Sequence, residues 1–199
     1  MLTRGLGEIY EIMNTNIKRW SVGSPIQAPL DSLLDLIREH QIKAEDVEKL
    51  VVRVAHQGAN TVDNRAMPDI CIQHMCAIMV IDGKVTFASS HDQKRMRDRK
   101  VLALRSRIEL HGDDALSAAM PSRQGIVEVS LNDGRKLRHH TKAVRGTAEN
   151  PMTRAEVDEK SYELMAPILG KSRARKLCDA IWMLEKIRDL RILRPLLRA

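Results

Sequence analysis

Residues 125–142 read GIVEVSLNDGRKLRHHTK, and this stretch decides the fold because it predicts a β-hairpin. Its strands are Gly125–Leu131 and Arg135–Lys142, joined by Asn132-Asp133-Gly134. The Asp-Gly pair supplies the positive φ angles that tight hairpin turns need. Further upstream, Val47–His56 is rich in Val and favours another strand. We therefore expect an antiparallel sheet in the middle of the chain.

Two helices are predicted before the hairpin. The first begins at Ser24-Pro25, because Ser caps helices and Pro suits their first turn, and its apolar spacing continues to about Glu39. The second covers residues 70–81, is capped by Asp69 and ends in a turn at Asp82-Gly83. This second helix is apolar on nearly every side, so we expect it to be buried.

The composition changes after Gly146, where a helical hairpin is predicted. Thr153 and Glu156 form a capping box that starts a helix over residues 154–169, and a second helix follows over residues 172–189. The fold class is therefore α+β, with an antiparallel sheet and helices followed by a C-terminal helical hairpin. The C-terminal helical part begins close to residue 149.

The composition is that of a folded globular protein with few aromatic side chains. Hydrophobic residues make up 43% of the 199 residues and aromatic residues only 3%, which excludes the stacking platforms that bind single-stranded nucleic acid. The net charge is +7, and residues 171–199 hold nine Lys or Arg against three Asp or Glu. This basic tail either binds nucleic acid or coats the exposed side of a docked helix. Its interleaved apolar residues favour the docked helix, so we expect no nucleic-acid partner.

Cysteine usage and hydropathy predict a cytoplasmic protein without a metal site. Cys71, Cys76 and Cys178 form no CxxC pair, which fits free thiols in a reducing compartment better than disulfides or zinc. Residues 1–10 do not read as a signal peptide, and the longest apolar run, residues 76–81, is too short to span a bilayer. We expect no membrane association.

Three ordered runs resemble one protein family. The first is NTNIKRW at residues 14–20 with GSPIQ at 23–27, the second is DNRAMPDICIQH at 63–74, and the third is RGTAENPMT at 145–153. Together they cover nearly the whole chain. The chain resembles the C-terminal portion of the MmgE/PrpD family, which includes 2-methylcitrate dehydratases, cis-aconitate decarboxylases and iminodisuccinate epimerases.

The resemblance implies a subunit with a large helical domain and an α+β lid inserted in it. Residues 1–17 then lead from the helical domain, residues 18–148 form the lid, and residues 149–199 return to an incomplete all-α domain. Family members are typically dimers, they need no cofactor, and their active sites lie between the two domains. This sequence starts just before the lid, so most of the helical domain and its acidic and histidine residues are expected outside it.

Three candidate site residues lie near the start of the lid. Lys18 matches the family's lysine at the domain junction, where it binds a substrate carboxylate or transfers a proton, unless it is an ordinary surface lysine. Ser24 follows Gly23 at a helix N-terminus, which attracts anions, although a plain capping motif explains the same residues and is the favoured interpretation. Gln27 lies one turn further on and faces either way. Ser24 and Gln27 are the substrate-binding candidates here.

Three further candidates lie in or after the polar, irregular stretch of residues 57–68. Asn64 and Arg65 are substrate-binding candidates, because Arg makes bidentate contacts to carboxylates; the alternative is a structural Arg paired with an Asp. His74 is a catalytic candidate on an otherwise apolar helix, at a position that matches an active-site tyrosine of decarboxylase-type members. A core histidine with satisfied hydrogen bonds is the alternative.

The chemistry implied by the resemblance is proton abstraction beside a carboxylate of a di- or tricarboxylate. Loss of water or carbon dioxide follows, or reprotonation in an epimerase, with cationic groups stabilising the enolate-like charge. We expect the chain to be inactive without the helical half, supplied as a separate chain or replaced by self-association. The alternatives are a non-catalytic remnant that acts as an interaction domain, and a basic nucleic-acid-binding protein.

Overall fold

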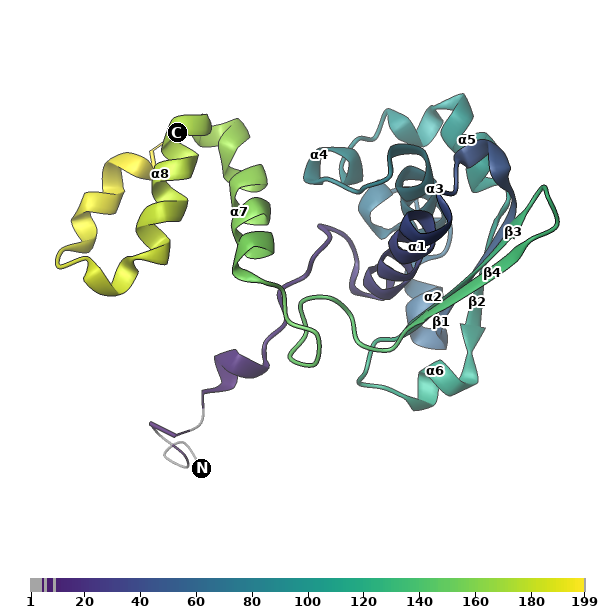
Figure 1. Cartoon of the computed structure of the whole chain (residues 1–199), viewed down its shortest axis with the longest axis horizontal. Coiled ribbons are helices and arrows are strands. Elements are labelled where there is room, and N and C mark those ends of the chain that lie inside the picture. The colour runs from purple at the N-terminus through teal and green to yellow at the C-terminus, as the bar shows by residue number, and fades with distance from the viewer. Residues whose placement is uncertain (1–4, 6, 9, 199) are drawn as a thin grey trace. The chain divides into compact units, whose positions relative to one another are not determined.

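The computed structural model describes residues 5, 7–8 and 10–198, which form two compact units (Figure 1). The first unit extends to Pro151 and the second begins at Met152. Each unit has its own helices and its own apolar cluster. The division into residues 1–17, 18–148 and 149–199 stays a prediction.

The first unit is built on a four-stranded sheet with the order β2-β1-β3-β4. Its strands are β1 (Val47–Ala55), β2 (Ile108–Asp113), β3 (Gly125–Leu131) and β4 (Lys136–Thr141). The predicted hairpin is confirmed as β3 and β4, and β1 pairs antiparallel with β3. Strand β2 was not predicted and lies parallel to β1, so the sheet is mixed rather than wholly antiparallel. Parallel neighbours need a long crossover, which the helices between β1 and β2 supply. The α+β fold class is confirmed.

Apolar side chains from one face of the sheet form the core with two long helices. In β1 the side chains of Leu50, Val52 and Val54 are buried, at the alternate positions that share one face of a strand. Helix α1 (Gln27–His40) packs on β3 and β4, and α3 (Ile72–Asp82) packs on α1. Figure 1 shows both helices on the same side of the sheet.

Helix α3 is the buried helix that the sequence predicts. Every residue from Ile72 to Val80 is buried, and the helix ends at Gly83 with a φ of 69°, as expected. The predicted cap is wrong, because the N-cap is Cys71 and Asp69 belongs to a preceding 3₁₀ turn, Pro68–Ile70. Pro68 starts that turn, since its fixed φ suits the first helical position.

The first predicted helix begins later than expected. Ser24–Ile26 forms a 3₁₀ turn, α1 starts at Gln27, and the side chain of Ser24 makes no capping hydrogen bond. Proline explains the shift. If the α-helix started at Pro25, Pro29 would have to donate an N–H that it lacks to Pro25. With Gln27 first, Pro29 falls in the first turn, where N–H groups have no partner within the helix.

Residues 57–68 are not wholly irregular, because α2 (His56–Val62) occupies their first half. Two side chains that donate to backbone carbonyls support this short helix. The Thr61 hydroxyl donates to the Gln57 carbonyl, and Arg65 donates to the carbonyls of Thr61 and Asn60 at the C-terminal end. The remaining short helices of the first unit are α4 (Phe87–Ser90), α5 (Arg99–Arg105) and α6 (Asp114–Ala118).

The second unit is a helical hairpin whose first helix has the predicted bounds. Helix α7 (Arg154–Leu169) starts at the predicted capping box, in which Thr153 and Glu156 exchange hydrogen bonds. Helix α8 (Lys171–Trp182) is shorter than the predicted residues 172–189. Short 3₁₀ turns follow it, and one of them places Leu193 against Leu169 and Leu177. Burial of Leu193 therefore prevails over the local helical spacing.

Candidate functional site

A cavity of about 570 Å³ in the first unit gathers positive charge. Four cationic side chains, Lys18, Arg123, Lys142 and Arg145, line it. Among the described lining residues, Glu149 is the one acidic side chain. Unlike charges attract strongly where water is partly excluded, so this composition favours a ligand that carries several negative charges.

Two walls of the cavity come from segments far apart in the sequence. Residues 14–18 form one wall and residues 142–149 the other. The Ile17 N–H donates to the Gly146 carbonyl at 2.8 Å and joins them. Gly146 has a φ of 98°, a conformation that glycine adopts without strain. This turn brings the second wall back to the first.

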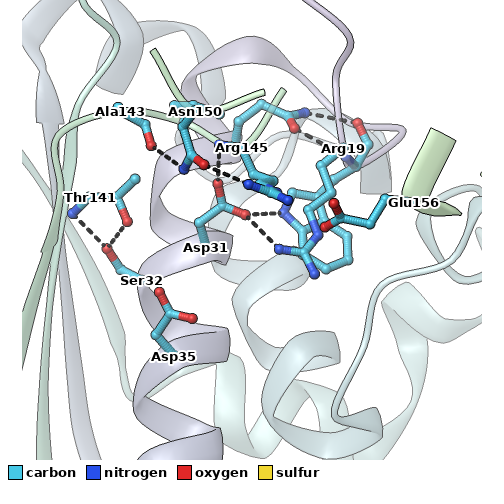
Figure 2. A network of polar contacts seen from close by, with 12 residues as sticks. Arg19, Asp31, Ser32, Asp35, Thr141, Ala143, Arg145, Asn150 and Glu156 are labelled. Carbon is cyan, nitrogen blue, oxygen red and sulfur yellow. Dashed lines mark hydrogen bonds and ion pairs between the residues drawn. The ribbon is translucent and has the colours of Figure 1, made fainter. Parts of the chain in front are cut away.

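The Asp31 carboxylate of α1 holds both walls in place (Figure 2). It accepts hydrogen bonds from the Trp20 indole at 3.0 Å and from the Arg145 backbone N–H at 2.9 Å, and the Arg19 guanidinium lies 3.7 Å away. Burial raises the pKa of this carboxyl, while the two hydrogen bonds and Arg19 favour the charged form. Asp31 is thus a buried anchor rather than a ligand-facing group.

Asn150 fixes the second wall from its other side (Figure 2). Its side-chain oxygen accepts from the Arg145 guanidinium at 2.7 Å, and its amide nitrogen donates to the Ala143 carbonyl at 3.0 Å. Its backbone carbonyl accepts from the Gly146 N–H at 2.8 Å. One residue therefore sets both the backbone path and the orientation of Arg145.

The end of β4 is tied to α1, which positions Lys142. The Ser32 hydroxyl lies 2.8 Å from the Thr141 hydroxyl and accepts from the Thr141 N–H at 3.1 Å (Figure 2). Ser32 is fully buried, so this contact is shielded from water. Lys142 directly follows the hydrogen-bonded Thr141, and its side chain is exposed.

Three predicted site residues lie at this cavity: Lys18, Ser24 and Gln27. Lys18 is exposed and donates to the Val22 carbonyl at 3.4 Å. Gln27 is 3% exposed, and its amide exchanges hydrogen bonds with the backbone of Trp20. Gln27 thus fixes the backbone around Trp20, whereas Lys18 presents a charge.

The other three candidates do not line the cavity. The Asn64 side chain accepts from Arg105 at 3.1 Å and donates to Asp63 at 3.0 Å, and its backbone has a φ of 44°. Arg65 uses its guanidinium on the carbonyl groups that end α2, not on a neighbouring Asp. Both side chains therefore have structural partners of their own.

His74 is fully buried on α3 and makes no hydrogen bond from either ring nitrogen within the described residues. Burial lowers its pKa to about 4, and the charges of Arg105 and Arg95 add to this effect. The ring is therefore neutral at pH 7. The structure does not bring His74 together with Lys18 at the cavity.

Three cations of the cavity, Arg123, Lys142 and Arg145, were not predicted as site residues, although a signal exists for the first two. Arg123 precedes β3 and Lys142 follows β4, so they flank the predicted hairpin. Gly125 pairs with Thr141 at the open end of that hairpin. Residues just beyond paired strand ends must lie close together, and the Ser122 hydroxyl indeed donates to the Lys142 carbonyl at 3.3 Å.

Neither a metal site nor a membrane-spanning helix is present among the described residues. The described part of the chain holds no group of three or more His, Cys, Asp or Glu side chains arranged to bind a metal ion. In the same residues, no helix has both the length and the apolar character needed to cross a membrane. Cys71, Cys76 and Cys178 are free and buried.

The chain is similar to curated 2-methylcitrate dehydratases and to one protein-family model. The 2-methylcitrate dehydratases of Salmonella typhimurium and Salmonella typhi are each 29% identical over 105 residues, which is 47% of this chain and 22% of each relative. The chain thus spans about a fifth of the length of these curated relatives. Residues 20–186, most of the chain, match the model of the MmgE/PrpD C-terminal domain. The protein belongs to the MmgE/PrpD C-terminal domain family.

Proposed function

We propose that this chain supplies the polycarboxylate-binding part of a cofactor-independent lyase or epimerase. The observation that carries the proposal is the cavity lined by Lys18, Arg123, Lys142 and Arg145 against one acidic side chain. Di- and tricarboxylates match this charge, and 2-methylcitrate, named for the Salmonella relatives, is a tricarboxylate. Whether water loss, decarboxylation or epimerisation follows depends on groups outside this cavity.

The cations have two tasks in such a reaction. They bind the substrate carboxylates, and they stabilise the enolate-like charge that develops when a proton beside a carboxylate is removed. Lys18 is our candidate for the group closest to the reacting carbon, since it was predicted from the family motif and lines the cavity. Asn64, Arg65 and His74 have no step in this proposal.

The described cavity holds no side chain with the features of a general base. Its one acidic side chain among the described lining residues, Glu149, is exposed, and the other charged lining residues are lysines and arginines. We therefore propose that the base comes from the helical half, on a separate chain or an adjoining part. The chain alone is expected to bind carboxylates without turning them over.

Carboxylate binding is tested by titrating the chain with tricarballylate, a tricarboxylate with no hydroxyl group to eliminate. Calorimetry at low ionic strength is expected to show binding that weakens as salt is added. Lys142→Gln should weaken it about fivefold or more, whereas Lys136→Gln, an exposed lysine of β4 outside the cavity, should leave Kd within about twofold. Equal effects of the two substitutions would contradict the proposal.

A second candidate function is that of an interaction module, favoured by the surface of the second unit. Ile168, Leu190, Ile192 and Leu197 are each at least 57% exposed there. Exposed apolar side chains at this density mark contact surfaces. Light scattering after size exclusion separates the candidates: a stable oligomer that does not bind tricarballylate supports the module, and tricarballylate binding supports the enzyme part.

A further inference from the structure

His139 of β4 faces α1 and contacts two of its side chains. Its Nδ1 atom lies 3.1 Å from the Ser32 hydroxyl oxygen, and its Nε2 atom lies 3.8 Å from the Asp35 carboxylate. Ser32 and Asp35 lie one turn apart on α1, so they share a face of this helix (Figure 2). His139 belongs to none of the three family motifs and does not line the 570 Å³ cavity.

The His139 ring connects solvent to a buried pair of hydroxyl groups. Its side chain is 34% exposed, so it exchanges protons with water. Ser32 and Thr141 are both buried, and their hydroxyl oxygens lie 2.8 Å apart. Histidine is the side chain that ordinarily changes its charge between pH 5 and 8. A change of pH in this range therefore reaches a contact inside the protein.

Protonation of the ring changes the direction of the buried hydrogen bonds. The Ser32 hydroxyl has one proton to donate and two lone pairs that accept, one of which takes the Thr141 N–H at 3.1 Å. When Nδ1 of His139 carries no proton, Ser32 donates to it and accepts from the Thr141 hydroxyl. In the protonated ring both nitrogens donate, so Nδ1 donates to Ser32. Ser32 then donates to the Thr141 hydroxyl, with the Gly125 carbonyl a more distant acceptor at 3.4 Å.

The protonated ring holds β4 more firmly to α1 than the neutral ring does. A hydrogen bond from a charged donor is about twice as strong as one between neutral groups. Thr141 is the last residue of β4, and the next residue, Lys142, lines the cavity. Strand ends open more readily than strand centres, so the contact between Ser32 and Thr141 decides how closely Lys142 is held.

We propose that His139 is a positioning residue of this cavity, and that its protonation tightens ligand binding by fixing Lys142 through Ser32 and Thr141. The inference rests on the proposed function, because the ligand is the carboxylate bound in that cavity. His139 itself does not touch the ligand. It acts on the backbone from which one of the four cationic side chains extends.

Three elements surround the His139 ring. On α1, Asp35 lies 3.8 Å away, and Glu39 lies one turn further along the same helix face. On β3 the paired residue is the uncharged Val127. On β4 the next residue, His140, points to the opposite face of the sheet, as adjacent residues of a strand do. The Asp35 carboxylate is therefore the charged group in contact with the ring.

The probe is tricarballylate, titrated into the 199-residue chain by calorimetry at about pH 5.5 and about pH 7.5. The ligand itself titrates in this range, so each variant is compared with the parent chain at the same pH. His139→Asn should raise Kd about fivefold at the lower pH and less than about twofold at the higher pH, because the charge-assisted bond exists only in the protonated ring. Equal ratios at the two pH values would overturn the inference.

His111→Asn is the matched control. It removes a histidine of β2 that does not line the cavity, and both of its ratios should stay within about twofold of the parent chain. A pH-dependent loss of the same size in this variant would show that any added positive charge strengthens binding. The specific role of His139 would then be wrong.

Ser32→Ala separates the hydrogen-bonded connection from the electric field of a charged ring. In the Ser32→Ala background, His139→Asn should change Kd by the same factor at both pH values, because the connection to Thr141 is already broken. A pH-dependent effect that persists there would overturn the positioning role. Circular dichroism verifies folding, and Ser32→Cys, whose thiol is a weak hydrogen-bonding group, serves should Ser32→Ala not fold.

Hydrogen exchange of the Thr141 amide gives a measurement without ligand. At about pH 5.5 this amide should exchange about fivefold faster in His139→Asn than in the parent chain. If tricarballylate does not bind and this difference is present, the proposed function fails while the connection from His139 to β4 stands. If tricarballylate binds and neither Kd nor the exchange rate depends on His139, the proposed function stands and this inference is overturned.

Discussion

The two units of the molecule bury apolar side chains to very different degrees. Among the described residues, the first unit has a cluster of 28 buried apolar residues between its sheet and helices. The second unit has a cluster of three, Leu169, Leu177 and Leu193. A unit as short as the second cannot bury enough apolar surface to offset the entropy of folding. The first unit is thus a self-sufficient scaffold, whereas the second is marginal on its own and has only a few polar contacts to add to its small cluster.

Those polar contacts are concentrated on one side chain. Arg175 of α8 binds the Asp158 carboxylate of α7 through two nitrogens, at 2.8 and 2.6 Å, and the Trp182 indole donates to the same carboxylate at 2.8 Å. The hydrogen-bonded Arg175 guanidinium lowers the pKa of Asp158. The first unit in contrast uses its buried Asp31 to attach segments to a core that already exists.

Separating the units should give the largest effect. A fragment of residues 1–151 is expected to fold and to melt cooperatively, because it keeps the whole large cluster. A fragment of residues 152–199 is expected to lose most of its helical circular dichroism, since its apolar cluster is small. Cooperative thermal unfolding of the isolated second fragment would refute this contrast.

The next largest effect is expected from Asp31→Ala in the first unit. The Trp20 indole and the Arg145 N–H would lose their buried acceptor, at a cost of about 3–4 kcal/mol in unfolding free energy. Denaturant titration followed by circular dichroism measures the loss. Asp35→Ala, on the same helix but at a half-exposed position, is the control and should cost less than about 1 kcal/mol.

Acidification should lower the unfolding free energy of the first unit, because the unfolded state can protonate His74 and the folded state cannot. Its pKa is about 4 in the folded state and 6.5 when exposed, so between these values the unfolded state binds more protons. Unfolding free energy should therefore fall by about 2–3 kcal/mol as the pH drops from 6.5 to 4. His74→Met should remove this part of the pH dependence, so the difference between the two proteins isolates it. Parallel pH curves would show that folding does not lower the pKa of His74.

The smallest effect is expected from Arg175→Gln in the second unit. The pair with Asp158 is open to solvent, so its loss should destabilise the helical hairpin only slightly. Hydrogen exchange of the α8 amides should then speed up about fivefold. Arg188→Gln changes the same residue type at an exposed position without a described partner and should leave the rates unchanged.

Local signals in the sequence predicted a good part of the fold. The Asp-Gly turn gave the hairpin, the apolar run gave α3, and the Thr153–Glu156 box gave the start of α7. Strand β2 escaped prediction because its sequence, IELHGD, has only two apolar side chains and ends in Gly-Asp, and because it pairs with a strand far away in the chain. Helix α2 escaped because Gly58 and β-branched Thr61 and Val62 disfavour a helix.

The candidate site was predictable only in part. The family motif singled out Lys18, Ser24 and Gln27, and these do lie at one cavity. Arg123 and Lys142 carry no motif, and only the pairing of the hairpin ends brings them there.

The hydrogen bond between Ile17 and Gly146 has a consequence for how force passes through the first unit. Tension applied to residue 17 and to residue 146 pulls directly on this one bond and on the Asp31 anchor behind it. The sheet and helices between these residues bear no tension until this hydrogen bond and the Asp31 contacts break. The two cationic walls would then separate before the sheet and helices unfold. The Ile17–Gly146 hydrogen bond and the Asp31 contacts therefore set the force at which the binding cavity opens.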